Sequence, residues 1–213
     1  MPATRTTNPP RFLYFDLGNV LFTFDRPRSC RQMAEVSGVP QAELTEFFAS
    51  ADSLVRLETG LATPAEVHAA FCERFDVNPP LASMCLAGSD MFRLNAPIVP
   101  LLTRLTLAGH RMGVLSNTSS PHWEFLNAGQ YWILHELFEV AILSYEVKSM
   151  KPDAGIYEAA AERVKMKPSE LFFTDDLSEN VEAARAAGWQ ATVFTSPSQL
   201  ANDLREMGVG FNY

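Results

Sequence analysis

Apolar residues are concentrated in five short runs that are rich in β-branched and aromatic side chains and bounded by turn or cap residues. Runs of this kind are typical of buried strands. They cover residues 11–17, 111–116, 139–143, 171–174 and 190–194. The last four alternate with segments of helical spacing, which predicts a parallel sheet covered by helices on both faces. We therefore expect an α/β fold built on a five-stranded, mainly parallel sheet.

The helices of this sheet are indicated by apolar residues three and four positions apart. The segments with this spacing are residues 97–108, 121–137, 153–164 and 178–187. A last helix is predicted over residues 198–207, with Ser198 as its N-cap.

Residues 26–93 interrupt the alternation, because they contain several helix signals and no convincing strand. Helices are predicted over residues 42–49, 65–75 and 81–91, and Thr63 with Glu66 three positions later marks one helix start. We expect an all-helical insert after the first strand. The predicted organisation is a core domain of residues 1–25 and 95–213, with residues 1–10 as a flexible tail, and a helical domain of residues 26–94.

Composition narrows the function classes. The chain has 213 residues, of which 47% are hydrophobic and 20% are charged, so it is expected to fold. A net charge of -8 without a run of Lys or Arg argues against binding to nucleic acid or to anionic membranes. The three cysteines follow no metal-ligand spacing and are expected to be reduced. No signal peptide is evident near the start, so we expect a cytoplasmic protein.

Polar residues of one chemical kind follow the predicted strands, at the edge where ligands bind in open parallel sheets. Asp16 ends the first strand, Ser116 and Asn117 end the second, and Lys148 and Lys151 follow the third. The fourth runs directly into Asp175 and Asp176. Carboxylates that converge with a lysine and a hydroxyl suit phosphoryl transfer, because a carboxylate can attack phosphorus and oxygen ligands hold Mg²⁺.

Each of these residues also has a structural explanation. Asp16 can cap a turn, and Asp175 or Asp176 can cap the helix that begins at residue 178. Lys151 can be a surface lysine, and Lys148 is expected to be solvated. His122, which follows Asn117 closely, is expected to be structural, and Arg56 and Glu58 can contact a substrate although no motif places them.

Four motifs in order resemble those of the haloacid dehalogenase (HAD) superfamily, over nearly the whole chain. They are FDLGNVL around Asp16, VLSNTS with Ser116 and Asn117, KSMKPDAGIY with Lys151, and FFTDDLSENVEAARAAGW with Asp175 and Asp176. The resemblance implies a Rossmann-like sheet of strand order 5-4-1-2-3. It also implies that the helical insert is a C1 cap, which closes over the active site.

The resemblance also implies a role for each motif residue. Asp16 would be the nucleophile and a Mg²⁺ ligand, and Lys151 would neutralise the transferring phosphoryl group. Ser116 and Asn117 would bind that group. Asp176 would ligate Mg²⁺, Asp175 would ligate it or orient a coordinated water, and the backbone carbonyl of Gly18 would be a further ligand. The implied enzyme is a Mg²⁺-dependent phosphatase that forms an aspartyl-phosphate and acts on a small phosphorylated metabolite.

One position departs from the family pattern. Most family phosphatases carry a second aspartate, a general acid, where this chain has Gly18. Loss of a positioned acid typically costs a factor of about 10²–10⁴, and less when the leaving group is weakly basic. We therefore expect a preference for anomeric sugar phosphates, aryl phosphates or acyl phosphates, and the DxGN pattern resembles that of sugar-1-phosphate phosphatases.

Two other functions are left open by the sequence. The same aspartate performs carbon–halogen hydrolysis in 2-haloacid dehalogenases, although the Asp175–Asp176 pair argues against that chemistry. A non-catalytic HAD-like protein that binds a phosphorylated ligand is also compatible with Gly18. The chain is expected to be a monomer or a homodimer.

Overall fold

The structure, a computed structural model, describes residues 8–49 and 51–212. Most of the predicted N-terminal tail, residues 1–7, lies outside the described residues. The central sheet contains β1 (Phe12–Phe15), β4 (Arg111–Ser116), β5 (Val140–Leu143), β6 (Leu171–Asp175) and β7 (Gln190–Val193). Its order is β5-β4-β1-β6-β7 and every pairing is parallel. Counted along the chain within this sheet, the order from β7 to β5 is 5-4-1-2-3. The predicted α/β class is confirmed.

Strand β1 shows why both faces of the sheet are covered. Successive side chains of a strand point to opposite faces, and all four residues of β1 are buried. Leu13 and Phe15 belong to the hydrophobic core on one face, and Phe12 and Tyr14 belong to the core on the other. A strand of this kind is apolar at every position, as the sequence pattern predicts.

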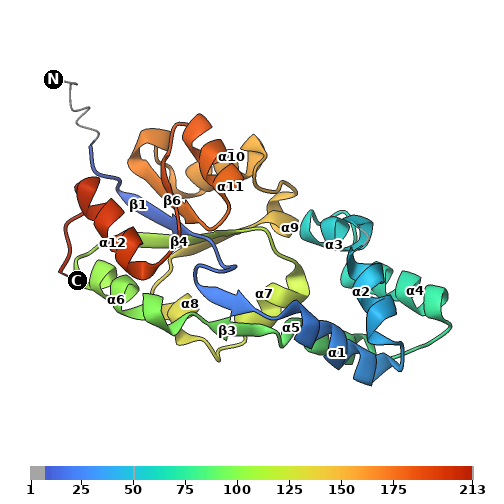
Figure 1. The fold of residues 1–213 in the computed structure, drawn as a ribbon. Helices are drawn as coiled ribbons and strands as arrows, with labels where there is room; N and C mark the ends of the chain where they lie inside the picture. The colour runs from blue at the N-terminus through green and yellow to red at the C-terminus, as the bar shows by residue number, and fades with distance from the viewer. Residues whose placement is uncertain (1–7, 50, 213) are drawn as a thin grey trace.

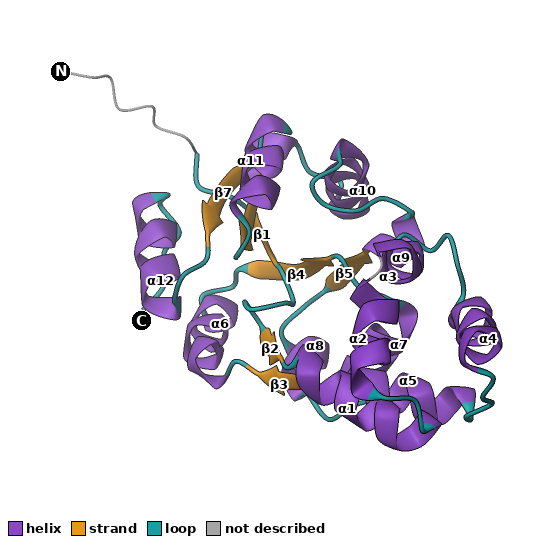
Figure 2. Cartoon of the chain, turned by 45° about the vertical axis from the view of Figure 1, so that its right-hand side comes forward, coloured by secondary structure: helices purple, strands orange, loops and turns teal. Residues whose placement is uncertain are grey.

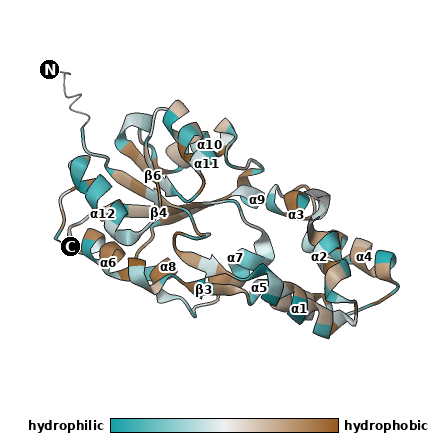
Figure 3. Ribbon diagram, viewed as in Figure 1, coloured by the Kyte–Doolittle hydropathy of each residue, from teal (hydrophilic) through white to brown (hydrophobic). Residues whose placement is uncertain are grey.

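Helices cover both faces of the sheet (Figure 2). One core is completed by residues of α6 (Val99–Leu107), α7 (Ser120–Leu126), α8 (Trp132–Glu136) and α12 (Pro197–Glu206). The other is completed by α10 (Ala154–Val164) and α11 (Ser178–Ala186). The short helices η1 (Ala96–Ile98), α9 (Ser144–Val147) and η2 (Pro168–Glu170) connect these elements. Figure 3 shows the strands as mostly hydrophobic and the outer faces of the helices as hydrophilic.

Two predicted helix boundaries are wrong. The helix expected over residues 121–137 is two helices, α7 and α8, because the segment between them contains Gly129 with a positive φ of 96°. An L side chain rarely adopts that backbone conformation, which a glycine adopts readily. The last helix begins at Pro197, and its N-cap is Ser196, which accepts a hydrogen bond from the Gln199 N–H, rather than Ser198.

Residues 26–89 form a helical unit that projects to one side of the sheet (Figure 1). It contains α1 (Arg26–Ser37), α2 (Gln41–Ala49), α3 (Ala51–Glu58), α4 (Pro64–Phe75) and α5 (Leu81–Ser89). The unit has its own hydrophobic core, in which Met33, Leu44 and Phe71 are buried. The predicted helix start at Thr63 is present, since Thr63 and Glu66 form a reciprocal capping box.

A two-stranded antiparallel sheet, which the sequence pattern did not predict, joins the helical unit to the core. It pairs β2 (Phe22–Phe24) with β3 (Phe92–Leu94), so the expectation of no strand within residues 26–93 is wrong at its end. Three-residue strands are too short to produce a recognisable alternation. The pairing brings the entry and exit of the helical unit side by side, and the Asp25 N–H donates to the Met91 carbonyl at 3.1 Å.

Candidate active site

The carboxyl ends of β1 and β6 bring two carboxylates to a single lysine. Lys151 Nζ lies 2.7 Å from Asp16 Oδ1 and 2.6 Å from Asp175 Oδ2, and it also donates to the Leu115 carbonyl at 3.2 Å. The Lys151 side chain is 1% exposed. Lys151 is therefore a buried cation between two carboxylates, which excludes the alternative of a solvated surface lysine.

Burial and neighbouring charges shift the pKa of Lys151 in opposite directions. Burial by itself would lower the pKa of Lys151, but the charges of Asp16 and Asp175 and their hydrogen bonds raise it above its ordinary value. Burial raises the pKa of Asp16, Lys151 opposes this change, and the charge of Asp175 adds to it. Two carboxylates that share one buried cation retain an excess of negative charge, and a further cation would be attracted to this point.

Asn117 positions Lys151 in this structure. Its amide Nδ2 donates to the Lys151 carbonyl at 2.8 Å, and its Oδ1 accepts from the Lys151 N–H at 2.8 Å. The resemblance implied that Asn117 binds the phosphoryl group, and in this structure both polar atoms of its side chain are engaged with the Lys151 backbone. Ser116, 2% exposed, ends β4 and lines the cavity beside it.

Asp175 accepts hydrogen bonds from more residues than Asp176 does. It is fully buried, and its carboxylate accepts from Lys151 Nζ, from the Leu177 N–H at 2.8 Å and from Asn180 Nδ2 at 3.0 Å. The bond to the Leu177 N–H also caps the turn before α11. Asn180 is 3% exposed, so it orders the acidic loop and is not a surface residue.

Asp176 is less buried than Asp175, and its carboxylate accepts a hydrogen bond from a side chain of the turn after β1. Asn19 Nδ2 donates to Asp176 Oδ2 at 2.8 Å. Asn19 has a positive φ of 54°, a left-handed conformation in which asparagine is enriched. The sequence analysis gave Asn19 no role. Its place one residue after Gly18, at a turn that leaves the sheet, was the signal that could have indicated one.

The carboxylates form a group that fits a divalent cation. Ligand oxygens of Asp16, Asp175 and Asp176 all lie within 4.8 Å of one another. Hard cations such as Mg²⁺ prefer carboxylate and carbonyl oxygens. The Gly18 carbonyl already accepts a hydrogen bond from the Val20 N–H at 2.7 Å, which leaves it one lone pair for a second partner. The donor set therefore fits Mg²⁺.

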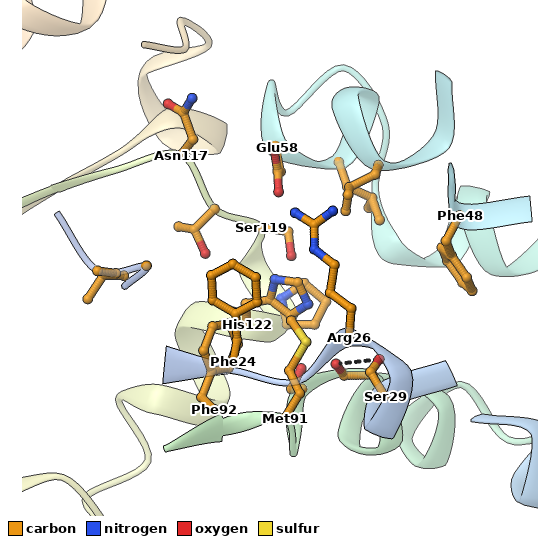
Figure 4. A pocket seen from close by; sticks show the side chains of 18 of the residues that line it. Phe24, Arg26, Ser29, Phe48, Glu58, Met91, Phe92, Asn117, Ser119 and His122 are labelled. Carbon is orange, nitrogen blue, oxygen red and sulfur yellow. Dashed lines mark hydrogen bonds between the residues drawn. The ribbon is translucent and has the colours of Figure 1, made fainter. Parts of the chain in front are cut away.

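A cavity of about 630 Å³ extends from these residues into the helical unit. Asp16, Ser116 and Lys151 line one end. Figure 4 shows Arg26, Glu58, Ser119 and His122 directed into the middle of the pocket. The sequence analysis missed Arg26. Asp25, which caps α1 by accepting from the Arg28 N–H, and a proline at the first turn were the signals for a helix start there.

The comparisons with known proteins agree with this geometry. Residues 15–188 match the haloacid dehalogenase-like hydrolase family. The chain belongs to this family. The predicted superfamily and hydrolase class of this HAD-like hydrolase are thereby confirmed.

Relatives of this HAD-like hydrolase carry phosphatase names. Phosphatase MT3486 of Mycobacterium tuberculosis is 26% identical over 216 residues, which cover 91% of this chain and 93% of that protein. A sesquiterpene phosphatase of Aspergillus oryzae is 24% identical over 91% of this chain and 94% of its own length. A HAD family enzyme of Bacteroides thetaiotaomicron, solved with magnesium and inorganic phosphate, superposes with a TM-score of 0.77 at 27% identity, covering 88% of this chain and 95% of that one.

Among the described residues, no helix is long and apolar enough to span a membrane.

Proposed function

We propose that this HAD-like hydrolase is a Mg²⁺-dependent phosphatase, which hydrolyses a small phosphate monoester through an aspartyl-phosphate on Asp16. The observation that carries the proposal is the position of Asp16, which lies at the end of β1, against Lys151, in the wall of the cavity. The phosphatase names of the relatives and the magnesium and phosphate bound by the Bacteroides enzyme support it.

Asp16 is the nucleophile of the proposed reaction, and Lys151 and Ser116 bind the phosphoryl group. The Asp16 carboxylate attacks phosphorus, a P–O bond to Asp16 forms, and the bond to the alcohol oxygen breaks. Lys151, with Ser116 beside it, stabilises negative charge on the phosphoryl oxygens, as preorganised donors do in a water-poor site. Water then attacks phosphorus, inorganic phosphate leaves and the Asp16 carboxylate is regenerated.

Asp16, Asp175, Asp176 and the Gly18 carbonyl would hold Mg²⁺. When it is bound, Mg²⁺ neutralises phosphate charge as a Lewis acid. Because Asp175 already accepts hydrogen bonds from three residues, its main contribution is to orient Lys151 and the acidic loop.

The departing alcohol takes its proton from solvent in this scheme, since Gly18 has no side chain. A Cβ at Gly18 would lie 3.2 Å from the Phe24 ring and 3.7 Å from Asp16 Oδ2, so an acid at this position would stand beside the nucleophile. The absence of an acid favours leaving groups of low basicity, among them anomeric sugar phosphates and aryl phosphates. We further propose that residues 26–94 act as the cap and residues 1–25 and 95–213 as the core.

Hydrolysis of p-nitrophenyl phosphate tests the phosphatase proposal, because its leaving group needs no acid. We expect turnover with Mg²⁺, loss of turnover with EDTA, and loss with Asp16→Asn at unchanged folding by circular dichroism. Turnover that is retained by Asp16→Asn, or that does not need metal, would overturn the mechanism. Chloride release from 2-chloropropionate without phosphatase activity would indicate a dehalogenase. Thermal stabilisation by phosphate without any turnover would indicate a binding protein.

A further inference from the structure

The cavity changes character as it leaves the carboxylates. At the core end its wall is polar, with Asp16, Ser116 and Lys151. Within the helical unit, aliphatic, aromatic and sulfur-containing side chains from α1 to α5 form the larger part of the lining, including Met33, Phe48, Leu57, Val67, Phe71 and Met84. In Figure 4, Phe48 lies across the pocket from Asn117, with Arg26, Glu58 and His122 between them.

Several polar side chains also line the part of the cavity within the helical unit, and three of them are bonded to protein backbone. Ser29 Oγ donates to the Gly88 carbonyl at 3.0 Å, and Thr45 Oγ1 donates to the Gln41 carbonyl at 2.9 Å. His68 Nε2 lies 2.8 Å from the Pro79 carbonyl. The hydroxyl hydrogens of Ser29 and Thr45 are thus already engaged, which leaves these two groups only acceptor lone pairs for the hydroxyl groups of a sugar. Ser89 Oγ, which also belongs to a lining residue, has no hydrogen-bond partner among the described residues. A hydroxyl that is buried without a partner costs roughly 1–3 kcal/mol.

Three ionisable residues near the middle of the cavity, Arg26, Glu58 and His122, have no side-chain hydrogen bond to another described residue. Arg26, whose guanidinium lies 5.5 Å from the centroid of the Phe24 ring, faces Glu58 and His122 in Figure 4. Burial lowers the pKa of His122 to about 4, and the Arg26 charge adds to this effect. His122 is therefore a neutral imidazole near pH 7. The charged side chains of the cavity therefore lie near the phosphoryl site, and the lining further into the helical unit is mostly apolar.

We propose that the substrate is the phosphate monoester of a predominantly hydrocarbon alcohol or phenol, whose apolar part occupies the cavity inside the helical unit. This inference rests on the proposed phosphatase function and names its substrate class. The cavity volume of about 630 Å³ lies in the range of pockets that enclose a drug-sized molecule. The cavity is continuous with the phosphoryl site, so one molecule can occupy both ends. A sugar phosphate would leave its hydroxyl groups against apolar side chains.

A series of aryl phosphates separates apolar binding from leaving-group chemistry. Phenyl phosphate, 4-ethylphenyl phosphate and 4-butylphenyl phosphate have leaving groups of nearly equal basicity and differ in apolar surface. We expect kcat/KM to rise along the series by up to about fourfold for each methylene that the cavity buries. We also expect each of the alkylphenyl phosphates to exceed glucose 1-phosphate. A flat series, or a higher kcat/KM for glucose 1-phosphate, would overturn the inference.

Substitutions in the helical unit test whether its cavity lining causes the preference for alkylphenyl phosphates. Leu57→Gln places a polar amide in the cavity wall, and its matched control is Leu86→Gln on α5, where the side chain is 60% exposed and does not line the cavity. We expect Leu57→Gln to lower the ratio of kcat/KM for 4-butylphenyl phosphate to that for phenyl phosphate. The control should leave the ratio and the activity unchanged. An unchanged ratio for Leu57→Gln, in a variant with an unaltered melting temperature, would contradict the inference.

The two proposals fail in different ways. If the phosphatase proposal is wrong, phenyl phosphate and p-nitrophenyl phosphate are not turned over at all. In that case the cavity is tested by the thermal shift that 4-butylphenol produces in the presence of Mg²⁺ and inorganic phosphate. A rise in melting temperature in the wild type that is absent in Leu57→Gln would support an apolar ligand site, and no rise would contradict it. If only the substrate class is wrong, phenyl phosphate is hydrolysed and the alkyl series is flat.

Discussion

Asn117 and Lys151 are joined by two reciprocal hydrogen bonds, each 2.8 Å long, between the side-chain amide of the first and the backbone of the second. The pair ties the loop after β4 to the loop after β5. Because these bonds hold the Lys151 backbone in place, its side chain extends to a point where Nζ contacts both Asp16 and Asp175. The asparagine therefore acts on the site through the lysine.

Substitution of Asn117 should change turnover more than substrate affinity. We expect Asn117→Ala to lower kcat by about tenfold to a hundredfold, since a displacement of Lys151 by about 1 Å is enough for such a loss. Asn117→Asp keeps the acceptor for the Lys151 N–H and should recover part of the activity. Steady-state kinetics with p-nitrophenyl phosphate measure both. A rise in KM at constant kcat would instead indicate that Asn117 only binds substrate.

Removal of the Lys151 charge should destabilise the fold. Lys151→Met leaves Asp16 and Asp175 buried without a cation, a change that typically costs about 3–5 kcal/mol. Urea unfolding in EDTA at pH 7.5 should show this loss, whereas Lys148→Met, at an exposed position, should show none.

The loss of unfolding free energy caused by Lys151→Met should become smaller as the pH falls. Burial already raises the pKa of Asp16 and Lys151 opposes this change, so without the lysine that pKa rises further above its unfolded value. The folded variant then binds more protons than its unfolded chain. Stability then increases on acidification through that interval. A deficit that is the same at pH 7.5 and pH 5 would mean that Lys151 contributes packing rather than charge.

His122 should make the protein less stable in mild acid. Its pKa is lowered from an ordinary 6.5 to about 4, so below pH 6.5 the unfolded chain binds a proton that the folded protein does not. Stability from this residue is fully present above pH 6.5 and decreases as the pH falls toward 4, by at most about 3 kcal/mol. The difference in unfolding free energy between the wild type and His122→Gln, measured from pH 7.5 to pH 4.5, reports it. A difference independent of pH would refute this assignment.

Gly60 should tolerate no side chain. It follows α3 with a positive φ of 65°, and a Cβ would lie 2.2 Å from the Tyr145 carbonyl oxygen of α9. Gly38 is the matched control, because its φ is 76° and a Cβ there meets nothing within 4 Å. Gly38→Ala should cost about 1 kcal/mol from backbone strain alone. Gly60→Ala should cost clearly more and should also lower kcat/KM, because the clash displaces Glu58. Equal melting temperatures for the two variants would argue against the close approach.

The sequence by itself determined the sheet and the acidic residues at its edge. Strand β1 is apolar at every position because it is buried on both faces, and a pattern of this kind is visible without coordinates. The chain order of β1, β4 and β6 placed Asp16, Ser116 and the Asp175–Asp176 pair at the ends of parallel strands. These features are local, since each depends on residues that are adjacent in the chain.

The tertiary structure decided which polar groups meet. Asn117 contacts a backbone 34 positions away, and Asn19 contacts a carboxylate 157 positions away. The cavity wall likewise draws its apolar side chains from α1 to α5, and in sequence those residues look like ordinary core positions. Contacts of this kind depend on strand order and on how the helical unit packs over the sheet. The pattern of hydrophobic residues along the chain does not encode distances between segments that lie far apart in the sequence.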